Sequence, residues 1–194
     1  MPQPNHISKL GVPDETSLDD DLQVIWRKCI DKLGFVPNVL QTYALRPQRL
    51  RNFMAMYNEV MLSESGISKL EREMIAVVVS AANRCYYCLV AHGAAVRQLS
   101  GDSQLGEMMA FNYRVATLPS RQRQMLDFAW KLTTTTHLVD DTDRDALSQQ
   151  GFSDADIFDI AETVSFFNLS NRMASATDMI PNAEYHMQAR TDAG

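Results

Sequence analysis

The sequence lacks the features that mark membrane-spanning and nucleic-acid-binding proteins. No apolar run approaches the ~20 residues that a membrane-spanning helix requires. The 194 residues include 18 lysines and arginines against 24 aspartates and glutamates, so the net charge is -6 and no basic patch stands out. We therefore expect neither a membrane nor a nucleic acid among the partners.

The first residues also lack the basic start and apolar core of a signal peptide, which predicts a cytoplasmic protein. Cysteines are few, with 3 in the chain. Thiols stay reduced in the cytoplasm, so a closely spaced pair there is more typical of catalysis than of a structural disulfide. The length and the apolar fraction of 45% suit one globular domain with a sizeable core.

Helical spacing of apolar residues dominates the chain and predicts an all-α fold. Residues 1–16, which are rich in proline, predict an extended arm, residues 17–185 a single helical domain and residues 186–194 a tail. Cap and stop signals, Gly34 among them, divide the domain into helices. Four consecutive threonines, 133–136, predict a loop, because threonine hydroxyls bond to nearby backbone groups. Cys29 falls in an apolar stripe, which predicts a core position.

The stretch from Ser68 to Leu99 carries the chemistry. Ser68 and Glu71 fit a capping box, which predicts that a helix begins there. The nearly all-round apolar run over residues 70–79 predicts burial on most sides, beyond the cover that a small monomer supplies, and so favours an oligomer. A buried strand is the alternative for a valine-rich run, but the cap and the length favour a helix.

A break near Asn83 decides what this stretch can do. In one unbroken helix, Glu73 would lie ~18 Å from Cys85. Asparagine is a poor interior residue and a good cap, so Asn83 predicts two helices that fold back on each other. Glu73 is ten residues before Asn83 and His92 nine after it, which would place the two opposite one another.

The hairpin would place a C-x-x-C motif at a helix N-terminus. Cys85 would begin the second helix, Cys88 would lie in its first turn, and His92 one turn further on the same face. The helix dipole favours a thiolate, the histidine can accept the thiol proton, and Glu73 can orient the histidine. Cys88 is then expected to be the better-activated thiol, with Cys85 placed to form a disulfide with it.

Other interpretations of these residues stay open. Cys85, Cys88 and His92 supply at most three zinc ligands, so Cys29 or His137 would have to complete the set. The cysteines could also be inert core residues. Tyr86 and Tyr87 flank the thiols and are candidates for lining a substrate pocket.

These residues form a spaced pattern: Glu73, eleven residues, Cys85-Tyr86-Tyr87-Cys88, three residues, and His92. The pattern resembles the active site of alkyl hydroperoxidase D-like (AhpD-like) proteins in the carboxymuconolactone decarboxylase superfamily. The peroxidase-related branch is similar at three further segments, which are Asn83-Arg84, residues 33–38 and residues 166–172. The whole resemblance spans roughly residues 20–185. It implies an all-α helical bundle that forms homo-oligomers and reduces organic hydroperoxides. By position it implies Cys88 as the peroxidatic cysteine, Cys85 as the resolving one, and His92 with Glu73 as the proton relay.

One departure bears on activity. The founding peroxidases carry a further relay histidine immediately before the second cysteine, where this chain has Tyr87, a weak base. The leading hypothesis is a hydroperoxide reductase that needs no bound cofactor and is recycled by an external dithiol. The rivals are thiol-disulfide exchange with a protein partner, metal binding through Cys85, Cys88 and His92, and decarboxylase or lactone chemistry by superfamily analogy, which has no use for a dithiol.

Overall fold

A computed structural model describes residues 3–190, and this range is helical without any strand, as the sequence predicts. The residues expected to fray, 191–194, lie outside the described range. The α-helices are α1 (Asp20–Leu33), α2 (Asn38–Tyr43), α3 (Pro47–Leu62), α4 (Lys69–Ala82), α5 (Tyr86–Ser100), α6 (Leu105–Asn112), α7 (Ser120–Thr134), α8 (Asp141–Gln149) and α9 (Asp154–Ala176).

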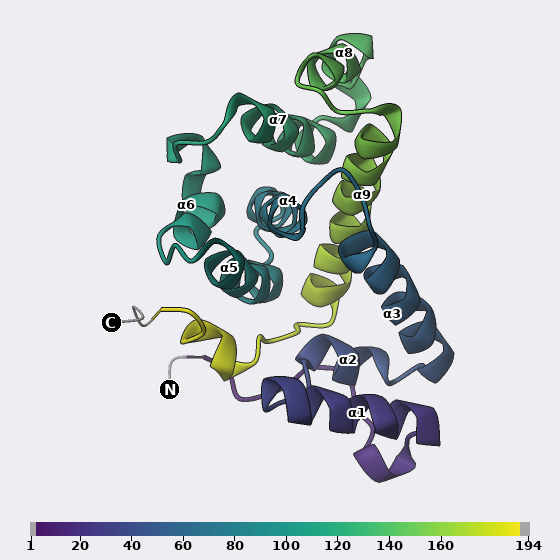
Figure 1. Cartoon of the computed structure of the whole chain (residues 1–194). Coiled ribbons are helices and arrows are strands. Elements are labelled where there is room, and N and C mark those ends of the chain that lie inside the picture. Colours follow the sequence, from purple (N-terminus) through teal and green to yellow (C-terminus); the bar gives the residue numbers. More distant parts are fainter. Residues whose placement is uncertain (1–2, 191–194) are drawn as a thin grey trace.

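Helix α4 lies at the centre of the molecule, surrounded by α5, α6, α7 and α9 (Figure 1). Every residue from Glu71 to Ser80 is buried, which confirms the burial expected from its all-round apolar sequence. Helices of this same chain supply the cover, so the need for a second subunit to cover α4 disappears. The argument for an oligomer that rested on this run was therefore wrong.

The break between α4 and α5 lies where Asn83 places it. Asn83 is the C-cap of α4, Arg84 adopts a left-handed conformation with φ of 54°, and Cys85 is the N-cap of α5. The capping box at Ser68 is also present: the Ser68 hydroxyl accepts from the Glu71 N–H, and Glu71 accepts from the Ser68 N–H. These local signals fix both ends of α4, so α5 returns alongside it.

Helices α1 and α2 form a separate layer below the bundle, with a small core built around Leu22, Trp26 and Leu50 (Figure 1). Gly34 ends α1 in the left-handed conformation with φ of 80°, as the sequence predicts. Residues 3–14 form no helix and lie against the segment that follows α9. The Lys9 N–H donates to the Thr177 carbonyl at 2.9 Å, and the Ile180 N–H donates to the Ile7 carbonyl at 3.0 Å.

The threonine run is more helical than the sequence predicts. Thr133 and Thr134 close α7, and a short 3-10 turn begins at Thr136, so the prediction of a four-residue loop was wrong. All four hydroxyls do donate to the backbone, but to the carbonyl four residues earlier, which the helix itself presents.

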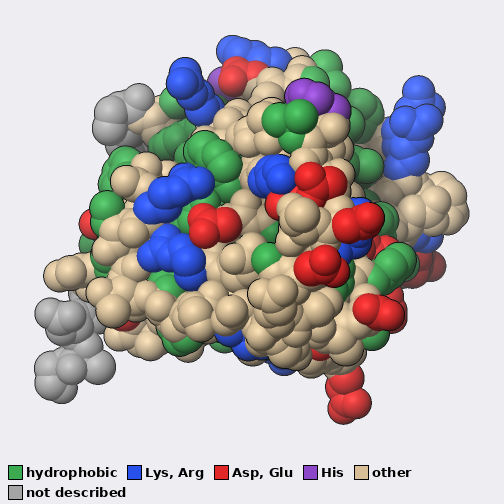
Figure 2. All heavy atoms as spheres, turned by 90° about the horizontal axis from the view of Figure 1, so that it is seen from above, with side chains coloured by type: hydrophobic (Ala, Val, Ile, Leu, Met, Phe, Trp, Pro, Cys, Tyr) green, Lys and Arg blue, Asp and Glu red, His purple; other side chains and the backbone are tan. Residues whose placement is uncertain are grey.

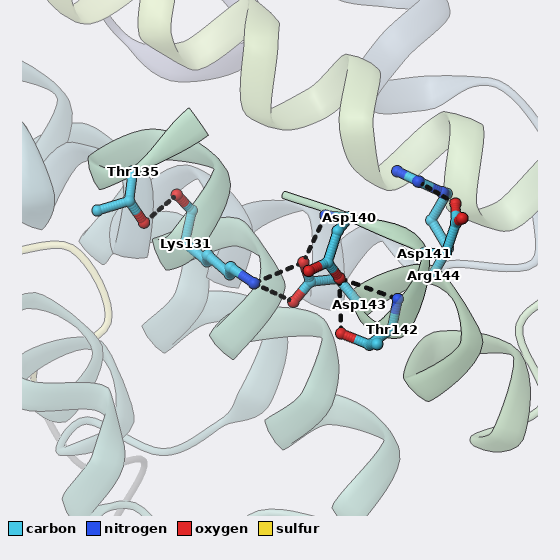
Figure 3. Close-up of polar contacts among 7 residues, drawn as sticks. All are labelled: Lys131, Thr135, Asp140, Asp141, Thr142, Asp143 and Arg144. Atoms are coloured by element: carbon cyan, nitrogen blue, oxygen red, sulfur yellow. Dashed lines mark hydrogen bonds and ion pairs between the residues drawn. The ribbon is translucent and has the colours of Figure 1, made fainter. Parts of the chain in front are cut away.

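An ion pair between Lys131 of α7 and Asp143 of α8 holds these two helices together. The Lys131 ammonium lies 2.8 and 2.6 Å from the Asp143 carboxylate oxygens (Figure 3).

The surface carries charges of both signs. On the face seen from the α8 end of the molecule, basic and acidic side chains are interspersed (Figure 2). Across residues 3–190, none of the helices combines the length and apolarity needed to span a bilayer.

Candidate functional site

The α4–α5 hairpin brings Glu73 and His92 together. His92 Nδ1 lies 2.6 Å from Glu73 Oε2, and both side chains are largely buried, at 13% and 11% exposed. In the tautomer whose Nδ1–H donates to the carboxylate, the other ring nitrogen, Nε2, is free to accept a proton, and the imidazole then becomes charged. The His92 and Phe167 rings pack edge to face, with 4.6 Å between their centroids, and this contact limits rotation of the imidazole. The pairing expected from the break at Asn83 is therefore present.

Cys85 and Cys88 are free thiols, 2% and 0% exposed. A hydrogen bond from Cys88 lowers the pKa of Cys85 to about 7, with help from the Ser175 hydroxyl and the charge of His92, against the opposing effect of burial. The same bond and burial raise the pKa of Cys88 well above its usual range. With Cys88 as the donor, this arrangement favours the thiolate at Cys85, at the N-cap of α5, whereas the sequence predicts the better-activated thiol at Cys88.

Helix α9 adds polar groups that sequence reasoning did not assign to the site. The Ser170 hydroxyl and the Asn171 amide both act to lower the pKa of Cys88. The orientation of Asn171 is fixed, because Nδ2 donates to Ser80 Oγ at 2.9 Å and Oδ1 accepts from Asn83 Nδ2 at 2.9 Å. Adjacent polar residues in an otherwise apolar helix were the available signal, but the sequence alone does not say that they face the thiols.

A cavity of about 380 Å³ opens beside the Glu73–His92 pair, and we call it the His92 cavity. Its lining includes Ser170, which bonds to Cys88, and Tyr87 and Ala91, which belong to the same apolar cluster as Cys88; Cys88 itself is 0% exposed. The Tyr87 hydroxyl accepts a hydrogen bond from the Val39 N–H at 3.1 Å, and burial raises the pKa of this phenol. Tyr87 is therefore part of the cavity wall, with its hydroxyl engaged elsewhere.

Tyr86 points to a second and larger cavity, of about 900 Å³, which we call the Tyr86 cavity. The arm and the segment after α9 line it, and the Tyr86 hydroxyl lies 3.1 Å from Gln3 Oε1. His186 Nε2 lies 2.9 Å from the same oxygen. The two adjacent tyrosines thus face different cavities.

The remaining candidate ligands do not gather around the motif. Cys29 is half-buried and lines the His92 cavity, so the prediction that it belongs to the core was wrong: α1 packs with this side toward the cavity. His137 is exposed in the turn after α7. Over the described part of the chain, no group of three or more His, Cys, Asp or Glu side chains is arranged to hold a metal ion.

Two solved structures resemble the chain over nearly its whole length. The peroxidase-related protein from Silicibacter sp. TM1040 is 57% identical with a TM-score of 0.93, covering 98% of this chain and 100% of its own. The peroxidase-related protein from Ralstonia eutropha JMP134, described as an alkylhydroperoxidase AhpD core, is 44% identical with a TM-score of 0.94, covering 97% and 100%. Both functions are described as uncharacterized.

More distant comparisons agree on the fold. The debrominase Bmp8 is 20% identical with a TM-score of 0.77, covering 96% of this chain and 97% of its own, and so shows the fold alone. No curated protein matched. Residues 47–104, which contain Glu73, both cysteines of the motif and His92, match the carboxymuconolactone decarboxylase family. Together with the two close structures, this match shows that the chain belongs to the AhpD-like, peroxidase-related proteins of the carboxymuconolactone decarboxylase superfamily.

Proposed function

We propose that this protein is a thiol-dependent peroxidase that reduces organic hydroperoxides through Cys85 and Cys88, with His92 and Glu73 as the proton relay. One observation carries the proposal: the imidazole bonded to Glu73 at 2.6 Å lies one helical turn from a buried dithiol and beside a cavity. An oriented base next to a thiol pair is the arrangement that nucleophilic sulfur chemistry needs.

The proposed reaction transfers two electrons from the thiol pair to the hydroperoxide. The Cys88 sulfur attacks the terminal oxygen, the O–O bond breaks, and the departing alkoxide takes one proton to become the alcohol. Cys88 is then a sulfenic acid. The Cys85 sulfur attacks it, a disulfide forms, and hydroxide leaves with the second proton as water. An external dithiol reduces the disulfide by exchange.

The roles of the two sulfurs follow from their surroundings. Cys88 is the attacking sulfur in the proposal because its neighbours Tyr87, Ala91 and Ser170 line the His92 cavity. Proton transfer from Cys88 to the Cys85 thiolate, or to His92, would generate the nucleophile when substrate arrives. In the second step Cys85 must attack as the thiolate, because a thiolate is needed to displace hydroxide. The Ser175 hydroxyl and His92, which help to lower the pKa of Cys85, remain in place after Cys88 has been oxidised.

A thiol count with intact mass tests the proposal. Reduced protein receives one equivalent of cumene hydroperoxide and is sampled over seconds. We expect rapid loss of two of the three thiols and a mass decrease of ~2 Da. The Cys85→Ser variant should accumulate a sulfenic acid that dimedone traps, and Cys88→Ser should give none. Thiols that survive for many minutes would contradict peroxidase activity.

Exchange with a protein disulfide is the second candidate. The observation behind it is Tyr87, whose hydroxyl is bound to the Val39 N–H and leaves His92 without the second relay base. In that case peroxide would react no faster than with free cysteine, while a dithiol protein would reduce an oxidised Cys85–Cys88 pair.

We also propose a cytoplasmic homo-oligomer, as the family resemblance implies. Apolar side chains on α9 remain uncovered within the described chain, including Phe158 at 65%, Leu169 at 50% and Met173 at 40% exposed. Light scattering of the purified protein would give the mass of the assembly.

A further inference from the structure

The His92 cavity has an unusually aromatic wall. A chain of ring contacts runs from α2 to the candidate base, with centroid distances of 4.3 Å for Tyr43–Phe53, 5.4 Å for Phe53–Phe166, 5.4 Å for Phe166–Phe167 and 4.6 Å for Phe167–His92. Aromatic surfaces favour aromatic guests, because edge-to-face and offset contacts add to apolar burial. The cavity volume of about 380 Å³ lies near the lower end of the range for small-molecule sites.

Two phenols supply a polar end to this apolar space. Tyr57 and Tyr185 both line the cavity, and within residues 3–190 neither hydroxyl has a hydrogen-bond partner. Burial raises the pKa of both, and the Glu73 carboxylate adds to the rise. Both phenols therefore stay protonated at neutral pH and can donate hydrogen bonds close to Glu73.

Tyr185 is held firmly although it follows the last long helix. The buried Arg97 guanidinium donates to the Tyr185 carbonyl at 2.9 Å and to the Gln188 carbonyl at 3.0 Å. The Tyr185 ring also meets Phe35 edge-on at 5.1 Å. These contacts hold the Tyr185 phenol in place, as a ligand-binding residue requires, although its segment contains no long helix.

Much of the wall comes from outside the stretch that matches the family. Cys29 and Leu33 belong to α1, Leu40 to α2, and Tyr185 with Gln188 to the segment after α9, whereas the match spans residues 47–104. The candidate chemistry and the shape of the cavity are thus supplied by different parts of the chain. Selectivity can then depend on residues outside the matched stretch.

We propose that the His92 cavity binds compact aromatic hydroperoxides, with the aromatic ring against the Phe53–Phe166 wall and the peroxide oxygens bonded to Tyr57 and Tyr185. This inference rests on the proposed peroxidase function and adds the class of substrate to it. In this arrangement the O–O bond lies at the polar end of the cavity, close to the Glu73 carboxylate that pairs with His92.

Thiol oxidation with three peroxides tests the selectivity. We expect the full chain to react with cumene hydroperoxide at least ~10-fold faster than with tert-butyl hydroperoxide or hydrogen peroxide. Ala95→Phe fills the cavity and should remove this preference, while Ala155→Phe, at an exposed position on α9, should keep it. The double variant Tyr57→Phe and Tyr185→Phe should lower the cumene hydroperoxide rate about fivefold, because it removes only the two hydroxyl donors.

Binding of 2-phenyl-2-propanol, the alcohol that cumene hydroperoxide yields, separates this inference from the proposed function. By ligand-observed NMR it should bind the reduced protein and Cys88→Ser equally, and Ala95→Phe should abolish binding. If no peroxide oxidises the thiols, the peroxidase proposal fails, and binding of the alcohol still decides the cavity's ligand class. Equal rates for all three peroxides, or binding that survives Ala95→Phe, would overturn the inference.

Discussion

Two cavities lie near the thiol pair, and adjacent residues face them: Tyr86 lines one and Tyr87 the other. The Tyr86 cavity is the larger, at about 900 Å³ against about 380 Å³, and it holds two histidines, His6 and His186. The difference lies in what surrounds each histidine. The Glu73 carboxylate, at 2.6 Å from His92, is 11% exposed, whereas the Asp178 carboxylate, at 3.0 Å from His6, is 56% exposed. His186 Nε2 meets only the neutral amide oxygen of Gln3, at 2.9 Å. Cavity size, residue type and a charged partner therefore do not distinguish the two cavities; what sets the proposed reactive side apart is that the carboxylate beside its histidine is buried.

Removing one histidine from each cavity is the strongest test of this contrast. We expect His92→Ala to slow peroxide-driven disulfide formation by about 100-fold, which is at the lower end of what a positioned general base contributes. His186→Ala, the matched change in the Tyr86 cavity, should stay within about twofold of the wild type. Stopped-flow thiol loss measures both, and equal losses would remove the distinction between the two cavities.

Asn171 connects α9 to the C-terminal end of α4 through hydrogen bonds with Ser80 and Asn83. Asn171→Ala would leave Ser80 Oγ without its donor and Asn83 Nδ2 without one acceptor. We expect the free energy of unfolding to fall by ~1–3 kcal/mol, because unpaired buried polar groups are costly. Asn52→Ala, on the exposed face of α3, serves as the control and should change stability little. Urea unfolding compares them, and similar midpoints would show that the buried network contributes nothing.

The shared proton between the sulfurs predicts a particular pH dependence. Cys85 has a pKa lowered to about 7, chiefly by the hydrogen bond from Cys88. Because the thiolate is the reactive form, alkylation of Cys85 should rise with pH and reach half its maximum near pH 7. Cys88→Ala removes the donor, so the half-point should move upward toward the ordinary cysteine value of ~8.5. A half-point that stays near 7 would assign the lowered pKa to His92 and Ser175 instead.

The smallest effect is expected at Tyr86. Tyr86→Phe removes a hydroxyl that meets Gln3 at 3.1 Å on the exposed side of α5. We expect peroxide reactivity and the free energy of unfolding to remain close to those of the wild type, since an exposed hydrogen bond contributes little. A large loss of reactivity would indicate that substrate or reductant approaches through the Tyr86 cavity.

The sequence predicted what local signals specify. The capping box at Ser68, the break at Asn83 and the stop at Gly34 depend on neighbouring residues, so helix bounds and the Glu73–His92 pairing followed from spacing. The positions of Cys29, Asn171 and Tyr185 depend on how distant helices pack, and spacing along one helix does not reveal which neighbour a face will meet. The relative pKa of the two cysteines depends on a hydrogen bond between them, and spacing along the chain does not reveal which sulfur donates it.

The contacts of the arm bear on how the molecule is assembled during synthesis. They join residues far apart in the sequence, such as Gln3 with Pro181 and Ser8 with Thr177, which are 178 and 169 positions apart. Contacts of such separation form late, because a long loop must close first. The side chains that cover Cys85 and Cys88 include Ala174 and Met179, which leave the ribosome long after α5. The nascent hairpin therefore carries uncovered thiols for a time, and the cell's reductants have their easiest access to the pair before the last 20 or so residues are made.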